Sequence, residues 1–111
     1  MLNKKNRLKK KKEFNFIYKK GESFHSKYLA LFVTKTKLNF CKIGFSVNNK
    51  IGNSVIRHKV KRRLTEIIRL NLAKLPVNNY IFVAKIGIEK LNYKELSDNV
   101  FYILKKAKII E

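Results

Sequence analysis

Apolar residues recur every three or four positions between residues 54 and 72, which predicts one long amphipathic helix. The apolar stripe consists of Ile56, Val60, Leu64, Ile67, Ile68 and Leu72. Before it, Gly52 predicts a turn and Asn53 an N-cap, because an Asn side chain accepts a hydrogen bond from a free N–H group of the first turn. Pro76 cannot continue a helix, so we expect the helix to end at about Leu75.

A shorter helix is predicted from about Lys11 to Lys20, followed by Gly21 as its stop. Its apolar residues Phe14, Ile17 and Tyr18 lie on one side. Phe14 and Tyr18 are one turn apart, and their rings have two interpretations. Both belong to the core, or one or both lie at the edge of a groove where aromatic rings stack on unpaired bases. The helical pattern alone does not decide between them.

Three stretches between residues 23 and 84 have strand character. Residues 23–36 are apolar on both faces around 28–34, as in a central strand. Residues 40–47 alternate, with one face formed by Cys41, Ile43, Phe45 and Val47. Leu38-Asn39 fits a hairpin between these two stretches. Residues 80–84 predict a third, buried strand.

The chain closes with a predicted helix from Lys90 to Ala107, in which Asn92 and Glu95 form a capping box. Its inward positions are Leu91, Leu96, Val100, Ile103 and Leu104. The predicted order is therefore helix, two or three strands, helix, strand, helix. A chain of 111 residues is long enough for one core but not for two, so we expect a single domain over residues 1–111.

The charges of the long helix oppose its own dipole. Within the predicted helix no acidic residue precedes Glu66, and the first turns carry Arg57, His58, Lys59, Lys61, Arg62 and Arg63. A helix N-terminus is partially positive, so each cation there costs from a few tenths to roughly 1 kcal/mol. A bound phosphate would compensate for this cost. A solvated surface helix is the plain alternative, but six basic residues at this end favour nucleic-acid binding.

The chain as a whole is basic, with 27 Lys and Arg against 7 Asp and Glu and a net charge of +20. Such a charge implies a polyanionic partner, while 45% hydrophobic residues exclude a disordered tail. No acid occurs between Glu22 and Glu66, so the basic field covers mainly the first two thirds. A basic arm at about residues 1–10, interrupted by Asn6 and Leu8, is expected to lack fixed structure by itself.

Several classes of protein are excluded. No apolar run approaches the ~18 to 20 residues of a transmembrane helix, and no signal sequence is present, so we expect a cytoplasmic protein without a membrane partner. Cys41 is the only cysteine, which excludes a disulfide within the chain and predicts a small core residue. Protein-based phosphodiester cleavage with a metal needs clustered carboxylates or His, and these residues are scattered. We therefore predict no catalytic and no metal-binding residue in the polypeptide.

Four segments, taken in order, resemble the protein subunit of bacterial ribonuclease P. They are Arg7-Leu-Lys9, Lys42-Ile-Gly-Phe-Ser-Val47, Lys50-Ile-Gly-Asn-Ser-Val-Ile-Arg57 and Lys61-Arg-Arg-Leu64. Where that family has Arg-Asn-Arg, this chain has Arg57-His58-Lys59. A Lys cannot make a bidentate guanidinium contact, so Lys59 is expected to hold a phosphate more loosely. His58 is either a spacer on the helix surface or an RNA contact.

The resemblance implies an α+β fold, an α/β sandwich of order α-β-β-β-α-β-α. It also implies that the basic helix lies in a left-handed crossover between parallel strands, against the usual right-handed rule. The activity implied is that of an endoribonuclease acting as a ribonucleoprotein, in which the RNA is the catalyst and removes the 5′ leader of precursor tRNA. Implied partners are ribonuclease P RNA and precursor tRNA, with no obligate protein partner and with Mg²⁺ bound mainly by the RNA.

By matching positions, the resemblance also implies two binding sets. The residues expected to contact the catalytic RNA are Arg57, His58, Lys59, Lys61, Arg62 and Arg63. The residues expected to line or border a cleft for the leader are Phe14, Tyr18, Phe32, Ser46, Lys50, Asn53, Arg57 and Lys61. The resemblance thereby favours the functional interpretation of Phe14 and Tyr18. A ribosomal or general RNA-binding protein remains the alternative, and nothing indicates the helix-turn-helix dimer of a DNA binder.

Overall fold

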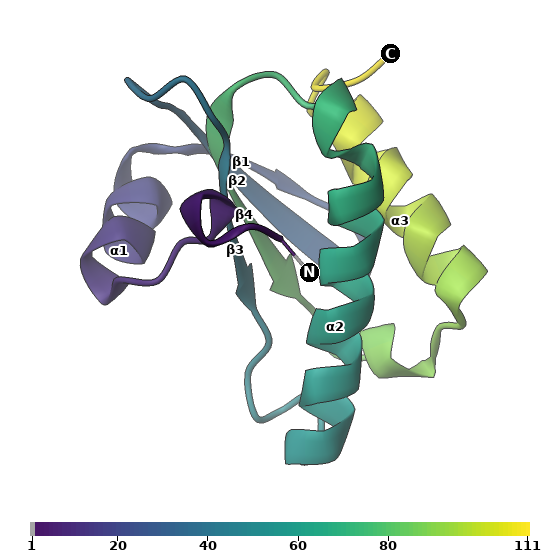
Figure 1. Cartoon of the computed structure of the whole chain (residues 1–111). Helices are drawn as coiled ribbons and strands as arrows, with labels where there is room; N and C mark the ends of the chain where they lie inside the picture. Colours follow the sequence, from purple (N-terminus) through teal and green to yellow (C-terminus); the bar gives the residue numbers. More distant parts are fainter. Residues whose placement is uncertain (1) are drawn as a thin grey trace.

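The computed structural model describes residues 2–111 as a twisted sheet with helices on both faces (Figure 1). Met1, the first residue of the predicted arm, lies outside the described residues. The main elements are α1 (Lys11–Lys20), β1 (Glu22–His25), β2 (Leu29–Lys35), β3 (Lys42–Ser46), α2 (Ser54–Asn71), β4 (Asn78–Ala84) and α3 (Tyr93–Lys106). Short 3₁₀ turns occur at η1 (Lys4–Asn6), η2 (Leu72–Lys74) and η3 (Ile88–Lys90). The predicted α+β sandwich and its order are confirmed.

The strand order in the sheet is β1-β2-β4-β3. β1 and β4 are both antiparallel to β2, whereas β3 is parallel to β4. The apolar stretch 23–36 therefore contains two strands. The hairpin predicted at Leu38-Asn39 is wrong, because β4 lies between β2 and β3 and the connection must pass over it. Nothing local in the sequence distinguishes this connection from a hairpin.

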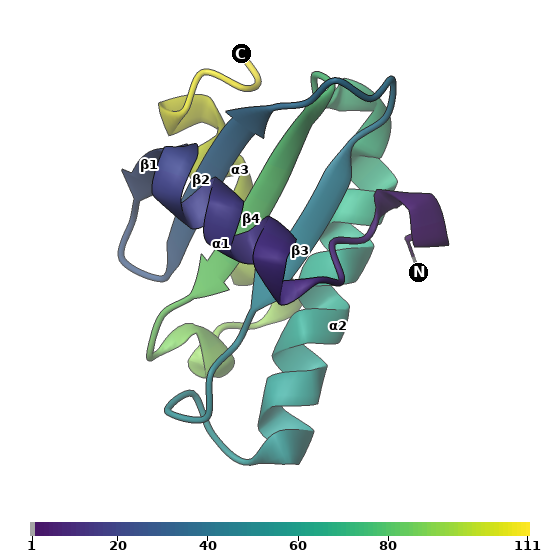
Figure 2. The same cartoon turned by 90° about the vertical axis from the view of Figure 1, so that its left-hand side faces the viewer.

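The crossover from β3 through α2 to β4 is left-handed. Figure 2 views the sheet from the side of α1, with α2 behind it; β3 lies to the right of β4 and both strands run downward. The chain thus passes behind the sheet and returns on the left of its starting strand, opposite to the common arrangement. The handedness implied by the resemblance is confirmed.

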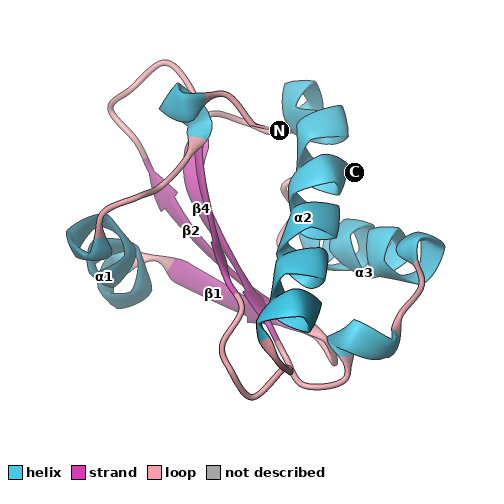
Figure 3. Cartoon of the chain, turned by 60° about the horizontal axis from the view of Figure 1, so that its bottom comes forward, coloured by secondary structure: helices cyan, strands magenta, loops and turns pink. Residues whose placement is uncertain are grey.

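α2 packs on the face of the sheet that it shares with α3 (Figure 3). Its buried residues are Val60, Leu64, Ile67 and Ile68. Ile56 is 37% exposed, so the buried stripe begins one turn later than predicted. The predicted cap is confirmed, since the Asn53 side chain accepts a hydrogen bond from the Ile56 N–H at 3.0 Å. α2 itself ends at Asn71 and continues as η2.

The capping box before α3 is also confirmed. The backbone N–H of Asn92 donates to the Glu95 carboxylate at 3.0 Å, and the backbone N–H of Glu95 donates to the Asn92 side chain at 2.8 Å. α3 begins at Tyr93 rather than Lys90, because Gly87 has a φ of 104° and starts the separate turn η3. Among the helices of residues 2–111, none is long and apolar enough to cross a membrane.

α1 lies on the opposite face of the sheet, where a second and smaller apolar cluster forms. Ile17 is its buried residue on α1 and packs with Leu8 and Ile81. Gly44 of β3 allows the Phe14 ring to approach closely, because a Cβ at position 44 would lie 2.5 Å from the ring. α1 is therefore held against the sheet by a few contacts at its centre and its beginning.

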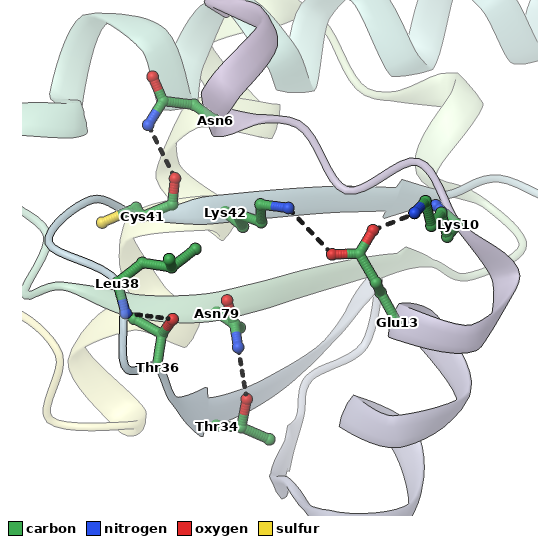
Figure 4. Close-up of polar contacts among 9 residues, drawn as sticks. All are labelled: Asn6, Lys10, Glu13, Thr34, Thr36, Leu38, Cys41, Lys42 and Asn79. Carbon is green, nitrogen blue, oxygen red and sulfur yellow. Dashed lines mark hydrogen bonds and ion pairs between the residues drawn. The ribbon is translucent and has the colours of Figure 1, made fainter.

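The N-terminal arm, residues 2–10, is docked along β3, contrary to the expectation that it lacks fixed structure. Leu2 and Leu8 are buried, and the Leu8 N–H donates to the Ile43 carbonyl at 3.0 Å. The buried Asn6 side chain donates to the Cys41 carbonyl at 2.7 Å (Figure 4). The two interruptions of the basic run, Asn6 and Leu8, are thus residues that face the protein.

An ion pair joins the first turn of α1 to β3. The Lys42 ammonium donates to the Glu13 carboxylate at 3.0 Å, and Figure 4 shows both side chains pointing toward each other. Partial burial acts to raise the pKa of Glu13, but the bonds from Lys42 and from the Lys10 backbone N–H outweigh it and hold this pKa below 4.5. Because the folded-state pKa is lowered, the contribution to stability is present above the ordinary pKa and is lost as the pH falls.

We predict that Asn6→Ala lowers the free energy of unfolding by about 1–3 kcal/mol, because the Cys41 carbonyl would then be buried without its donor. Urea unfolding measures the difference, and Asn3→Ala, at an exposed position of the same arm, is the matched control. An Asn6→Ala protein that unfolds at the same urea concentration as the control would show that the arm is not docked in solution.

We also predict that Glu13→Gln changes the pH dependence of stability. The free-energy difference between the parent chain and Glu13→Gln should be largest near neutral pH and should shrink as the pH falls below about 4.5. Urea unfolding across this range measures it. In a Lys42→Met background the same substitution should have much less effect. A difference that stays constant with pH would contradict the ion pair.

Candidate nucleic-acid interface

Four of the six basic residues at positions 57–63 of α2 lie on its solvent-exposed surface. His58, Lys59, Lys61 and Arg62 are exposed, as the sequence pattern predicts for the solvent face. Within residues 2–111, none of the six basic residues at positions 57–63 forms an ion pair with a carboxylate. The first turn of α2 also contains no acidic residue. The helix therefore presents positive charge that the described part of the protein does not neutralise.

Two members of this basic set also stabilise the fold. The Arg57 Nε donates to the Gly52 carbonyl at 3.2 Å, which fixes the guanidinium beside the start of α2. The Arg63 Nη1 donates to the Leu91 carbonyl at 3.3 Å, on the side that faces α3. Both side chains are partly buried. Arg63 is therefore displaced from the other basic residues toward the α3 side, a division that sequence spacing did not reveal.

The aromatic residues predicted for the leader cleft meet on the other face of the sheet. The Tyr18 ring contacts the Phe32 ring edge to face, with centroids 4.9 Å apart, and Phe14 lies 6.3 Å from Tyr18. All three rings pack against the small apolar cluster, yet each retains exposed surface. The two interpretations of Phe14 and Tyr18 are therefore compatible, because the rings are both packed and accessible.

The strand residues predicted for the cleft share this face. Phe32 of β2 pairs with Ile81 of β4, and Ser46 of β3 pairs with Val83 of β4, so their side chains point to the same side. Val83 is half-buried beside these residues and belongs to the same surface, although we did not predict it. The sequence does not show which face of the strand Val83 occupies, because residues 80–84 are apolar throughout.

Two further predicted residues, Lys50 and Asn53, lie just before the beginning of α2. Lys50 is exposed in the loop that precedes the helix, and Asn53 is exposed as well. Since the Asn53 side chain already accepts a hydrogen bond as the N-cap, only its remaining capacity is available for a ligand. Lys61 lies farther along the helix, where it and Phe14 line a groove beside the arm.

One accessible aromatic residue was missed. The His25 ring of β1 lies 6.3 Å from the Phe32 ring in a T-shaped arrangement, so the row of rings continues to the edge of the sheet. His25 is exposed, and its carbonyl accepts a hydrogen bond from Lys106 at 2.6 Å. The sequence predicts one strand over residues 23–36, and a single strand does not place His25 beside Phe32.

Within residues 2–111, no three His, Cys, Asp or Glu side chains come together as a metal site. Cys41 is buried, as predicted, and its Sγ lies 3.3 Å from the Pro76 carbonyl. The prominent features are therefore unneutralised cations on one face and accessible aromatic rings on the other, which together suit binding of RNA.

Comparisons with known proteins agree with this combination. The family model described as Ribonuclease P matches residues 2–108. A ribonuclease P protein component from Clostridium botulinum is 40% identical over 108 residues, covering 96% of this chain and 97% of the relative. The counterpart from Alkaliphilus metalliredigens is 36% identical over 106 residues, covering 95% and 96%.

Solved structures show the same similarity in three dimensions. The ribonuclease P protein of Staphylococcus aureus superposes with a TM-score of 0.91 at 27% identity, covering 96% of this chain and 98% of that one. These matches do not favour the ribosomal or general RNA-binding alternative. The sequence motifs, the fold and the comparisons together show that the chain belongs to the ribonuclease P protein family, the protein component of a ribonucleoprotein endoribonuclease of tRNA processing.

Proposed function

We propose that α2 binds the catalytic RNA of ribonuclease P, while the sheet face beside α1 binds the single-stranded 5′ leader of precursor tRNA. The observation that carries the proposal is the basic face of α2, which has no carboxylate partner among the described residues and lies at a helix N-terminus. Phosphate groups would supply the missing negative charge. The six basic residues at positions 57–63 are the proposed contacts.

The leader is proposed to lie across Phe14, Tyr18 and Phe32, with Ser46, Lys50, Asn53, Arg57 and Lys61 at its border. Partly exposed rings offer faces on which unpaired bases stack, and each such contact is worth about 1–3 kcal/mol. Lys50 and Arg57 would hold the leader phosphates near the start of α2. The two proposed RNAs thus lie on opposite faces of the sheet and meet at the edge strand β3.

The contribution of the protein to the reaction is proposed to be electrostatic and positional. A net charge of +20 screens the repulsion between two RNA molecules and opposes the binding of free Mg²⁺ by the protein itself. We therefore place the catalytic magnesium mainly on the RNA and the protein in the bacterial cytoplasm with precursor tRNA. No obligate protein partner is needed in this arrangement.

The proposed contact with the catalytic RNA predicts an effect of substituting Lys59, an exposed residue of the basic face. Lys59→Ala should weaken binding to ribonuclease P RNA. It should also reduce the steepness of the slope of log affinity against log salt concentration by about 0.7–0.9, the effect of one lost phosphate contact. Lys59→Arg should bind more tightly because a guanidinium makes two parallel hydrogen bonds. Binding titrations over a range of salt concentrations measure both effects.

Lys94→Ala is the matched control for charge, since Lys94 is exposed on α3 and is not one of the six proposed contacts. Its salt dependence should equal that of the parent chain. Equal slopes for Lys59→Ala and the parent chain would remove α2 from the proposed contact with the catalytic RNA.

A substitution of Phe14 separates the leader surface from the core. Phe14→Ala should weaken the affinity of the holoenzyme for precursor tRNA by about 1–3 kcal/mol and should leave its affinity for mature tRNA, which has no leader, nearly unchanged. Phe16→Ala is the control, because Phe16 is on the same helix and is 56% exposed.

Urea unfolding of both variants distinguishes binding from folding. If Phe14→Ala lowers the affinity for precursor tRNA and for mature tRNA equally, or if the variant is unfolded, the interpretation of this ring as a leader contact is wrong and the core interpretation holds.

A further inference from the structure

A groove of about 310 Å³ lies between the N-terminal arm and α2, beside the edge strand β3. We call it the arm–helix groove. Its apolar lining includes Leu8 of the arm, Phe14 of α1 and Phe45 of β3. His58, Lys61 and Arg62 of α2 line its other side. The groove is therefore built from four parts of the chain that only the fold brings together.

The arm–helix groove depends on the docked arm. The Leu8 N–H binds the Ile43 carbonyl at 3.0 Å, and Arg7 forms a parallel bridge with the same strand residue. The arm thereby forms one wall, and α2 forms the opposite wall because its buried stripe holds it against the sheet. Thr65 also lines the α2 wall, with its hydroxyl donating to the Lys61 carbonyl at 2.7 Å.

The composition of the groove matches a single nucleotide. Its size is at the lower end of the 300–1,000 Å³ typical of small-ligand sites. Aromatic and aliphatic side chains suit the flat face of a base, and cations on the rim suit its phosphate. No acidic side chain lines it, so a cationic ligand is disfavoured. A base can enter such a groove only when it is unpaired.

We propose that the arm–helix groove receives one unpaired nucleotide of the catalytic RNA, with its base against Phe45 and its phosphate beside Lys61 and Arg62. This inference rests on the proposed function and adds a defined base site to a surface otherwise described by charge alone. Such a site would fix the register of the protein on the RNA, which phosphate contacts by themselves do not do.

The position of the groove favours the catalytic RNA over the leader. His58, Lys61 and Arg62 all come from the segment proposed to bind the catalytic RNA. Tyr18 and Phe32, the other aromatic residues of the leader surface, do not line the groove. The Phe14 ring lies tightly over Gly44, where a Cβ would be 2.5 Å away, and so lies between the two surfaces.

Crosslinking tests the proposal directly. The full chain is bound to its cognate ribonuclease P RNA without precursor tRNA, irradiated with ultraviolet light, and the crosslinked peptides and nucleotides are identified by mass spectrometry. We expect Phe45 or His58 to be joined to one unpaired nucleotide of that RNA. Thr65→Phe, which places a ring in the groove, should abolish this crosslink and weaken RNA binding about tenfold.

Two controls separate filling of the groove from other effects. Thr65→Val keeps the volume of the side chain and should retain the crosslink. Val55→Phe adds a ring at an α2 position that is 74% exposed, and it should also retain the crosslink. Crosslinks from Lys59 should persist in every variant. The crosslink in the parent chain needs no substitution and thus remains decisive if Thr65→Phe does not fold.

Each other outcome overturns the inference. The groove is not a site for the catalytic RNA if its residues crosslink only to the leader after precursor tRNA is added. It is no base site at all if Lys59 crosslinks while the groove residues do not, or if Thr65→Phe binds as tightly as Thr65→Val. If no part of α2 crosslinks to the RNA, the proposed function fails together with the groove.

Discussion

Burial of one face of α2 against the sheet is the constraint on which both proposed surfaces depend. Each of its buried residues, such as Leu64 and Ile68, contributes about 1.5–3 kcal/mol relative to exposure. A cation in the first turns costs at most roughly 1 kcal/mol. Apolar burial therefore outweighs the unfavourable charge, and the helix can hold a basic face outward at a position where a stable isolated helix would carry acids. Without a bound anion, the cations destabilise the start of α2. Binding of an anion there would remove this destabilisation.

The edge strand β3 connects the parts of this arrangement. It is parallel to β4, and its free edge is covered by the docked arm, which protects its backbone groups from pairing with other chains. Its small residue Gly44 lets Phe14 approach, while Lys42 anchors the first turn of α1 through Glu13. Because α1 and α2 lie on opposite faces, a single short strand sets the distance between the proposed leader surface and the proposed RNA-binding helix.

Local patterns predicted what is encoded locally, and they failed where distant segments decide. The range of α1, the cap of α2 at Asn53 and the capping box of α3 follow from spacing and side-chain chemistry. The connection at Leu38-Asn39 and the docking of the arm depend on β4 and β3, which no local pattern locates. The left-handed crossover was implied only by family resemblance. Of the site, the basic residues were recognisable from their placement, whereas His25 and the arm–helix groove appear only in three dimensions.

Cleavage of a precursor tRNA by its cognate ribonuclease P RNA at low magnesium, with and without this protein, tests the central claim most directly. At low magnesium the RNA lacks enough counterions to bring two polyanions together, so a protein of net charge +20 should have its largest effect there. The account predicts strong stimulation by the protein, lost progressively as salt is raised, and no cleavage by the protein alone. Unchanged cleavage in the presence of the folded protein would contradict it.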